Sequence, residues 1–324
     1  MRAIRHTVAT AVLAGALLAG TPPASAADRP VLRQGDFTAE QQPAASETPR
    51  FKRPRRDNPT RDGTLTRAQR NILAAWFTGA TTRYRHSPFG SDKHPDTLTV
   101  SAAGNRVLRF TLPADSVFED RVPRLADING DGEDEIVVVR SYLKKGAALA
   151  VLALRDNALS IIAETPAIGT PMRWPNPAGI ADFDGDGRLD IALVVTPHSA
   201  GELQIWTLHN GELELIADLD DVSNHVMGSN HQGLSAVADF DGDGIADLAI
   251  ASANRLNLRF LTMRGGKLRE LGSATLPAPV AEDFAVVVVD GLPAVKVGLA
   301  GGRSMVISPC RAVDDWRMVK GECP

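Results

Sequence analysis

Short aliphatic runs flanked by small and polar residues recur along this chain. Three of them, Ile136–Val139, Ile191–Val195 and Leu248–Ile250, occupy similar places in a repeating unit. Runs of this length and composition predict β-strands rather than helices. In the middle repeat the pattern predicts four successive strands, at residues 178–181, 189–196, 202–208 and 212–217, with a hairpin turn at Asn210-Gly211.

A nine-residue acidic loop precedes each of these aliphatic runs. Its three copies are Asp127–Glu135, Asp182–Asp190 and Asp239–Asp247, and their first aspartates lie 55 and 57 residues apart. A regular period of this length accommodates one four-stranded sheet per repeat. The sequence therefore predicts an all-β fold, a β-propeller whose blades are four-stranded antiparallel sheets.

The acidic loops have the composition of a metal site. Oxygen-bearing side chains stand at positions 1, 3, 5 and 9, and hard oxygen ligands favour calcium over zinc or copper. An EF-hand is excluded, because an aliphatic residue and a strand follow where that motif needs a bidentate Glu and a helix. With position 7 included, the predicted metal ligands are Asp127, Asn129, Asp131, Glu133, Glu135, Asp182, Asp184, Asp186, Arg188, Asp190, Asp239, Asp241, Asp243, Ile245 and Asp247.

The acidic loop resembles the repeat of the FG-GAP (VCBS-type) family, known from integrin alpha-subunit heads and many secreted bacterial proteins. The pattern Ala-Asp-Phe-Asp-Gly-Asp-Gly-x-x-Asp with a following hydrophobic residue is nearly complete at 181–191 and 238–248, and the first copy departs from it at Ile128 and Asn129. The resemblance implies a β-propeller with a structural calcium ion (Ca²⁺) in each intact blade, about three ions in all. It implies no single activity, because the family includes adhesion modules, lectin-like binders and accessory domains of polysaccharide-cleaving enzymes.

Two degenerate repeats flank the three intact ones. Asp96 stands before Thr97–Val100 as Asp190 stands before its strand, and Asp290-Gly291 aligns with the third loop but lacks the later ligands. We therefore expect about five blades within residues 71–310, three of them with an intact calcium loop.

The N-terminal region differs in composition from the repeats. Residues 1–26 carry Arg2 and Arg5, then an apolar stretch and Ala24–Ala26, which is typical of a secretory signal peptide. The apolar stretch is too short to span a bilayer. Residues 27–70 are rich in Pro and Arg and predict a disordered tail. We expect an exported protein, periplasmic or secreted, with no transmembrane span.

Cys310 and Cys323 are the two cysteines of the chain. An oxidising compartment allows them to pair, and the disulfide would tie residues 311–324 to the last blade. A free-thiol catalyst is the weaker interpretation.

The charge is distributed unevenly. The whole chain carries −4, to which residues 1–26 contribute +2 and residues 27–70 contribute +4, so residues 71–324 carry −10. An acidic folded region argues against nucleic acid as a partner.

Strand alternation predicts a second group of functional residues. Because successive turns of an antiparallel sheet alternate between its ends, the turns about eight residues before and sixteen residues after each loop's first aspartate share the calcium-free face. That surface could bind a ligand, or its residues could form a hydrogen-bonded plug over the central channel. The ligand-binding candidates are Trp174, Asn176, His198, Asn224, His225, Asn230 and His231.

Three other tryptophans have structural interpretations. Trp206 is expected to pack between blades, and Trp76 is expected within a short helix or capping segment, Ala68–Phe77. Trp316 lies inside the predicted disulfide loop.

No nucleophile and base pair stands out in the sequence, which has no Gly-x-Ser-x-Gly elbow and no His-Glu-x-x-His helix. The leading hypothesis is a non-catalytic binding or adhesion module for a glycan or an envelope protein. One alternative is a polysaccharide lyase or hydrolase that uses His198, His225 or His231 with Arg255 or Tyr142. A further alternative is a structural component of an envelope assembly, tethered by the basic tail.

Overall fold

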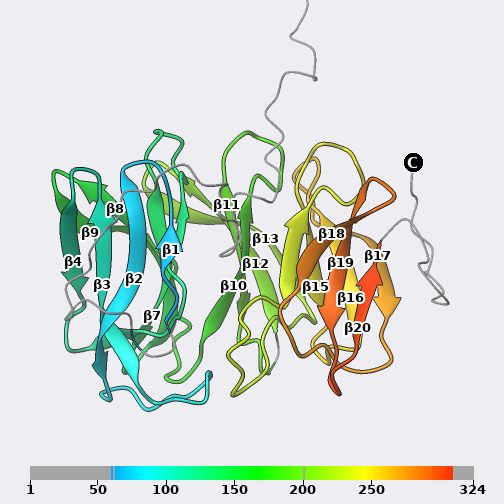
Figure 1. Ribbon diagram of the computed structural model, residues 1–324, viewed down its shortest axis with the longest axis horizontal. Coiled ribbons are helices and arrows are strands. Elements are labelled where there is room, and N and C mark those ends of the chain that lie inside the picture. Colours follow the sequence, from blue (N-terminus) through cyan, green and yellow to red (C-terminus); the bar gives the residue numbers. More distant parts are fainter. Residues whose placement is uncertain (1–59, 61–62, 200, 309–324) are drawn as a thin grey trace, which may run out of the picture. The chain divides into compact units, whose positions relative to one another are not determined.

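The computed structural model describes residues 60, 63–199 and 201–308. The predicted signal peptide, most of the predicted tail and both cysteines lie outside these residues. The described residues contain no helix, and therefore none that could cross a membrane. Their strands form antiparallel sheets, which we number first to fifth in chain order (Figure 1). The all-β prediction is confirmed.

The first sheet corrects two predictions. It consists of β1 Thr66–Arg67, β2 Ile72–Thr81, β3 His94–Ala102 and β4 Arg106–Thr111. The helix or capping segment predicted at Ala68–Phe77 is wrong, because most of this run belongs to β2 and pairs with β3 along its length. The boundary predicted at residue 71 is also wrong, since β1 pairs with β2 and the Thr60 amide donates to the Phe77 carbonyl at 3.0 Å.

The second sheet has an interrupted first strand. Both β5 Ser116–Phe118 and β6 Arg124–Ala126 pair with β7 Glu135–Tyr142, which is followed by β8 Gly146–Arg155 and β9 Ala158–Glu164. The segment between β5 and β6 buries Glu119 and Asp120.

The third and fourth sheets have the regular four-stranded order. The third contains β10 Pro175–Ala181, β11 Asp190–Val195, β12 Glu202–His209 and β13 Glu212–Asp220. The fourth contains β14 Ser235–Ala238, β15 Asp247–Ala251, β16 Asn257–Thr262 and β17 Arg269–Thr275. The four strands predicted for the middle repeat are confirmed, with ends shifted by up to three residues.

The fifth sheet has three strands in the described part of the chain: β18 Ala285–Val289, β19 Leu292–Gly298 and β20 Ser304–Ile307. Asp290-Gly291 forms the turn between β18 and β19, where the acidic loop stands in the intact repeats. This position is the one predicted for a degenerate repeat.

Each sheet packs on the next through an apolar core, which makes the fold β-propeller-like. In the core between the first and second sheets, the rings of Phe77 and Phe118 lie 5.2 Å apart. Trp206 packs between the second and third sheets, as predicted. Leu261 packs between the third and fourth sheets, and Val295 between the fourth and fifth.

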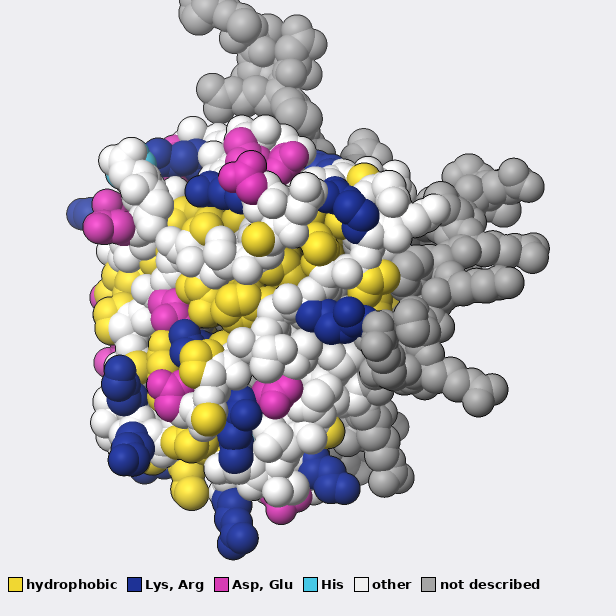
Figure 2. Space-filling view, turned by 90° about the vertical axis from the view of Figure 1, so that its left-hand side faces the viewer, with side chains coloured by type: hydrophobic (Ala, Val, Ile, Leu, Met, Phe, Trp, Pro, Cys, Tyr) yellow, Lys and Arg dark blue, Asp and Glu magenta, His cyan; other side chains and the backbone are white. Residues whose placement is uncertain are grey.

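Apolar side chains also reach the surface beside the outer strands of the first two sheets. Strands β4 and β9 are neighbours, and Leu108, Phe110 and Ile161 from these strands are partly buried against the core between the two sheets. Figure 2 shows hydrophobic side chains gathered near the middle of this face, with charged side chains around them.

Candidate functional site

The three acidic loops, residues 127–135, 182–190 and 239–247, are called the metal loops. They connect the first and second strands of the second, third and fourth sheets. In each loop the first aspartate accepts a 2.9 Å hydrogen bond from the glycine amide at position 6. These glycines, Gly132, Gly187 and Gly244, have φ of +88°, +91° and +87°, a region that other residues seldom adopt.

The second residue of each metal loop anchors it in the core. Ile128, Phe183 and Phe240 are at most 2 % exposed and pack in the second-to-third, third-to-fourth and fourth-to-fifth cores respectively. Their amides donate to the carboxylate at position 9, over 3.0, 3.1 and 2.8 Å. The loops are therefore coupled to the packing between sheets.

The second and third metal loops each gather carboxylates closely enough to hold a metal ion. Asp182, Asp184 and Asp190 each offer an oxygen within 4.8 Å of the others, and so do the equivalent residues Asp239, Asp241 and Asp247. All of these donors are hard oxygen atoms, which suit calcium or magnesium.

The protonation chemistry of these loops fits a bound cation. Burial, together with the charge of Asp184, raises the pKa of Asp190 to about 7. Burial, together with Asp241, raises the pKa of Asp247 to about 7. One oxygen of Asp247, Oδ1, is buried and has no hydrogen-bond partner among the described residues. A cation would satisfy that oxygen and remove the repulsion, so the residues fit the metal that the family implies.

The first metal loop is partly neutralised by the chain itself. The Asn129 amide donates to Asp131 Oδ2 at 3.0 Å and to Glu135 Oε1 at 2.9 Å. Arg70 places a guanidinium nitrogen 3.3 Å from Asp127 Oδ2. Asp127 Oδ1 is nevertheless buried without a hydrogen-bond partner in the described structure, so one oxygen still faces the site unsatisfied. This loop fits a metal less well than the other two.

Position 7 of the metal loops differs in chemistry between the three copies. The amides of Glu133, Arg188 and Ile245 donate to the position 5 carboxylate at 2.8 Å in all three loops. The Arg188 side chain donates to Asp186, and a cationic or aliphatic side chain cannot bind a metal ion. For Arg188 and Ile245 the backbone carbonyl oxygen is the atom that remains as a ligand, whereas Glu133 also keeps its carboxylate.

The end of the sheets away from the metal loops is called the opposite end. One connection between two strands joins the turns there. Residues 223–233 link β13 to β14 and are called the crossing segment. The Gly228 amide donates to Pro88 O of the first sheet at 2.7 Å, and Asn230 O accepts from Arg121, just after β5 of the second sheet, at 2.6 Å. The Gly233 amide donates at 2.7 Å to Asp283, just before the fifth sheet. These contacts support the interpretation of a hydrogen-bonded plug.

Four of the seven ligand-binding candidates are buried in this plug. Asn176, Asn224 and His225 are fully buried, and Trp174 is 2 % exposed. Asn224 Nδ2 donates to Asn176 O at 3.0 Å, and Asn176 Nδ2 donates to Gln232 O at 2.8 Å. Their amides hold the crossing segment to the third sheet and do not face solvent.

The other three candidates reach the surface. His198 is partly buried and Asn230 is exposed. The His231 side chain is 45 % exposed, and its Nδ1 lies 3.1 Å from Asp283 Oδ2. A ligand at the opposite end would meet these side chains first.

Two histidines form a direct pair. His198 Nε2 lies 2.6 Å from His225 Nδ1, and His225 Nε2 lies 3.1 Å from Ser229 O. Because Ser229 O can only accept, His225 Nε2 is the protonated nitrogen and its Nδ1 accepts from His198 Nε2–H. His198 Nδ1 is left as an acceptor. The ring of Trp174 stacks on His198 at 5.9 Å and 15°.

Both histidines are held in the neutral form. Burial, followed by the charges of His86 and Arg255, lowers the pKa of His198 to about 4. Burial, followed by His198, lowers the pKa of His225 to about 3.

Sequence reasoning missed a buried carboxylate at this end. Glu119 is fully buried, its Oε1 lies 2.5 Å from His86 Nδ1, and its Oε2 accepts from Ser141 at 2.5 Å. The backbone carbonyl of Glu119 accepts from the Trp174 indole at 2.7 Å. The repeat offered a signal for it, since Glu119 stands eight residues before Asp127, as Trp174 stands before Asp182.

Tyr142, which the enzyme alternative pairs with a histidine, instead contacts Glu164 and Arg140. Its hydroxyl donates to Glu164 Oε2 at 2.8 Å, and the Arg140 guanidinium lies 4.3 Å from its ring centroid. Burial and this carboxylate raise the pKa of Tyr142 to about 12.

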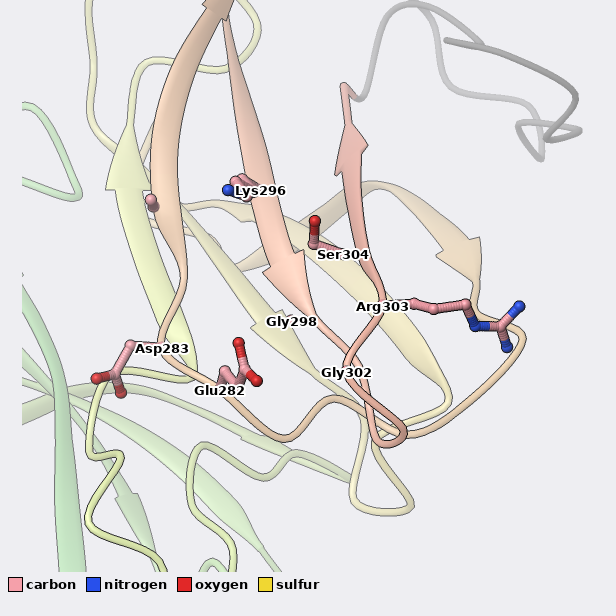
Figure 3. A pocket seen from close by; sticks show the side chains of 8 residues that line it. Glu282, Asp283, Lys296, Gly298, Gly302, Arg303 and Ser304 are labelled. Atoms are coloured by element: carbon pink, nitrogen blue, oxygen red, sulfur yellow. The ribbon is translucent and has the colours of Figure 1, made fainter.

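A shallow cavity of about 280 Å³ lies beside the crossing segment on the fifth sheet. Figure 3 shows Lys296 and Ser304 on its strands, with Glu282 and Asp283 at one end and Arg303 at another side. Asp283 links the cavity to His231 and Gly233, so the cavity extends the surface of the opposite end.

Antiparallel sheets follow one another along the chain, and three of them carry a metal loop after the first strand. These features define the class of protein: it is β-propeller-like and built from metal-loop repeats. The model of the FG-GAP-like repeat matches residues 127–193 and 182–250. Residues 127–250 therefore consist of FG-GAP-like repeats, as the acidic loops predicted. No curated protein matches the sequence.

One solved structure with a similar chain course is "Crystal structure of rhamnogalacturonan lyase YesW". It has a TM-score of 0.38 and 15 % sequence identity, and the match covers 65 % of this chain. This chain spans 50 % of the length of that structure. A likeness at this level carries no argument about activity.

Proposed function

We propose that this protein is an exported, calcium-stabilised binding module that takes a glycan or an envelope protein at the opposite end, without catalysis. The observation that carries the proposal is the crossing segment. Hydrogen bonds tie it to several sheets while it presents Met227, 55 % exposed, and the exposed Asn230. A rigid scaffold with exposed, variable side chains is the usual arrangement of a binding surface.

The metal loops support the calcium part of the proposal. Calcium prefers several oxygen ligands in flexible geometry, which these aspartates and loop carbonyls supply. The ion would contribute positive charge that holds the carboxylates together. Asp182, Asp184 and Asp190 would hold it in the second loop, and the equivalent residues in the third.

A binding screen of glycans and envelope proteins on the mature chain tests the proposal. Asn230→Ala and His231→Ala should each weaken the interaction found, because these side chains stand at the proposed surface. His209→Ala is the matched control, since His209 ends β12 at the same end as the metal loops. If binding is lost in the control but kept in both test variants, the binding surface lies at the metal-loop end instead.

The histidine pair supports a second candidate, a polysaccharide lyase or hydrolase. His198 is partly exposed, and its neutral ring retains an acceptor nitrogen that can take up a proton. The test is depolymerisation of polyuronates by the wild-type chain and by His198→Ala. Turnover that disappears in the variant would establish an enzyme, and binding without turnover would retain the binding module.

A structural role in an envelope assembly rests on the basic tail, whose residues 27–59 lie outside the described structure. Deleting the tail should abolish localisation and partner recovery if the tail is a tether. Unchanged localisation would remove this option.

A further inference from the structure

The cavity on the fifth sheet, called the fifth-sheet cavity, is bounded by charged and polar groups. Its volume is about 280 Å³, and residues before β18, in β19 and around the start of β20 line it. Figure 3 shows Glu282, Lys296 and Ser304 around its middle, while Asp283 and Arg303 extend to either side. The three central residues are exposed, so a small molecule in solution reaches them.

Alternation along β19 puts the polar lining on the side of the fifth sheet away from its core. Val295 and Val297 are fully buried in the core shared with the fourth sheet, whereas Lys296 between them is exposed. Gly298 follows on the same side of the strand as Lys296, and the register pairs Gly298 with Ser304 of β20. The floor of the cavity is therefore a fixed piece of β-sheet backbone.

Gly298 allows Glu282 to lie directly against this floor. A Cβ on Gly298 would lie 2.6 Å from Glu282 Cβ and 2.8 Å from Glu282 Cδ, so no larger residue fits beneath the side chain. The Ala281 amide donates to the Gly298 carbonyl at 2.9 Å, which holds the chain where it carries Glu282. Asp283 instead accepts from the Gly233 amide at 2.7 Å. Glu282 is therefore the carboxylate that is left to the cavity.

Two opposite charges border this cavity without pairing. In the described part of the chain, neither the Glu282 carboxylate nor the Lys296 ammonium has a hydrogen-bond or ion-pair partner. The Glu282 side chain lies over Gly298, and two residues of a strand span about 7 Å, so the two charged side chains start from neighbouring positions on one floor. A ligand that carries an ammonium and a carboxylate on one carbon atom offers a charged partner to each of them.

We propose that the fifth-sheet cavity binds an α-amino acid, whose ammonium pairs with Glu282 and whose carboxylate pairs with Lys296. The Ser304 hydroxyl donates to the same carboxylate. A free amino acid and an amino acid joined to a polymer through its side chain both present these two groups. The inference goes beyond the proposed function, because this site does not depend on the glycan or envelope protein proposed for the surface at Asn230 and His231.

The experiment is NMR titration of the calcium-loaded mature chain with alanine, N-acetylalanine and alaninamide. N-acetylalanine lacks the ammonium and alaninamide lacks the carboxylate, so each derivative removes one half of the proposed contact. Alanine should shift the amide signals of Gly298 and Gly302, which line the cavity, and should leave that of Gly211, in the turn between β12 and β13, unchanged. Each derivative should bind roughly fivefold or more weakly than alanine, because exposed ion pairs are individually weak but both are needed here.

Two substitutions assign the two contacts separately. In Glu282→Gln, alanine should bind more weakly than to the wild-type chain and no more tightly than N-acetylalanine, because the ammonium has lost its partner. In Lys296→Gln, alanine should bind no more tightly than alaninamide. Glu212→Gln and Lys267→Gln are the matched controls, since they remove the same charges from exposed positions at the metal-loop end. Both controls should bind alanine within about twofold of wild type.

Several results would overturn this site. Alanine would leave the signals of Gly298 and Gly302 unchanged, or Glu282→Gln or Lys296→Gln would bind it like wild type. N-acetylalanine that binds as tightly as alanine would reduce the cavity to an anion site, and alaninamide that does so would reduce it to a cation site.

Two further comparisons separate the source of the ligand and the fate of the two proposals. Nε-acetyllysine that binds like alanine would support a polymer-linked amino acid, and weaker binding would support a small free one. A chain that binds alanine but no glycan or envelope protein would retain the cavity site and remove the proposed function. Binding of a glycan or envelope protein without any binding of alanine would do the reverse.

Discussion

A single carboxylate oxygen, Asp247 Oδ1, illustrates what the metal loops require. It is buried, has no hydrogen-bond partner in the described structure and belongs to a group whose pKa is raised to about 7 by burial and then by Asp241. The other oxygen, Oδ2, is satisfied by the Phe240 amide at 2.8 Å. One oxygen of this side chain therefore stabilises the loop, and the other is available to a cation.

The substitution Asp247→Asn distinguishes the roles of these two oxygens. The variant should bind calcium about tenfold more weakly, because affinity follows the number of ligand charges. A tenfold loss in a saturated site corresponds to about 1.4 kcal/mol, or roughly 3–6 °C in melting temperature for a domain of this size. In chelator the sign should reverse, since the variant lacks one repelling carboxylate. Thermal unfolding with calcium and with chelator measures both, and a variant less stable in both conditions would contradict the metal role.

The histidine pair predicts an acid-sensitive stability. An unfolded histidine titrates near pH 6.5, whereas folding lowers the pKa of His198 to about 4 and that of His225 to about 3. The unfolded chain therefore takes up protons first as the pH falls. The contribution of the pair is complete above about pH 6.5 and is lost progressively toward pH 3.

Urea unfolding between pH 7.5 and 4 in saturating calcium tests this pH dependence. Calcium must be present, because the metal-loop carboxylates have raised pKa values and would titrate with the opposite sign. His225→Gln should flatten the slope, and His209→Gln serves as the control. Equal slopes in the wild-type and His225→Gln chains would refute the prediction.

At the scale of elements, sequence reasoning succeeded where one pattern repeats. The acidic loops, the strands after them and the Asn210-Gly211 hairpin were predictable because spacing and turn chemistry agree. β2 was not, since Ile72-Leu-Ala-Ala-Trp-Phe77 favours helix locally and becomes a strand only by pairing with β3. β1 could not be predicted, because two residues joined to β2 by backbone pairing leave no side-chain pattern.

The residues of the candidate surface could also be predicted from the sequence only in part. Strand alternation correctly placed the crossing segment among the turns opposite the metal loops. It could not separate the exposed Asn230 from the buried Asn224, because burial depends on which neighbouring sheets the segment touches. The buried position of Asn224 comes from its hydrogen bond to Asn176, 48 residues away.

The first metal loop should be the weakest of the three. Asn129 already places its amide against two of its carboxylates, whereas the other two loops carry an aspartate at this position. Calcium titration should therefore resolve two tighter sites and one weaker site. Asn129→Asp should strengthen the weak site, because it replaces a competing donor with a fourth carboxylate at a ligand position. Asp184→Asn is the matched reverse change in the second loop. Three equal sites in the wild-type chain would contradict this ranking.

At the scale of the whole molecule, the metal loops and the packing between sheets share residues. Ile128, Phe183 and Phe240 each belong both to a metal loop and to the core between two successive sheets. Neighbouring loops also touch, because a Cβ on Gly185 would lie 2.9 Å from the side chain of Ile245. Loss of a bound metal from one loop would therefore reach the next sheet.

This coupling predicts that calcium stabilises the whole domain rather than the loops alone. Two sites, each at a calcium concentration about 100 times its dissociation constant, contribute about 2.7 kcal/mol apiece, which corresponds to roughly 10–20 °C in melting temperature. Chelation should lower the melting temperature by that amount in a single transition. Hydrogen exchange should rise first at the Phe183 and Phe240 amides and then along β11 and β15. The double variant Asp182→Asn with Asp239→Asn should no longer respond to chelator, whereas an unchanged melting temperature in the wild-type chain would show that the sheets hold together without metal.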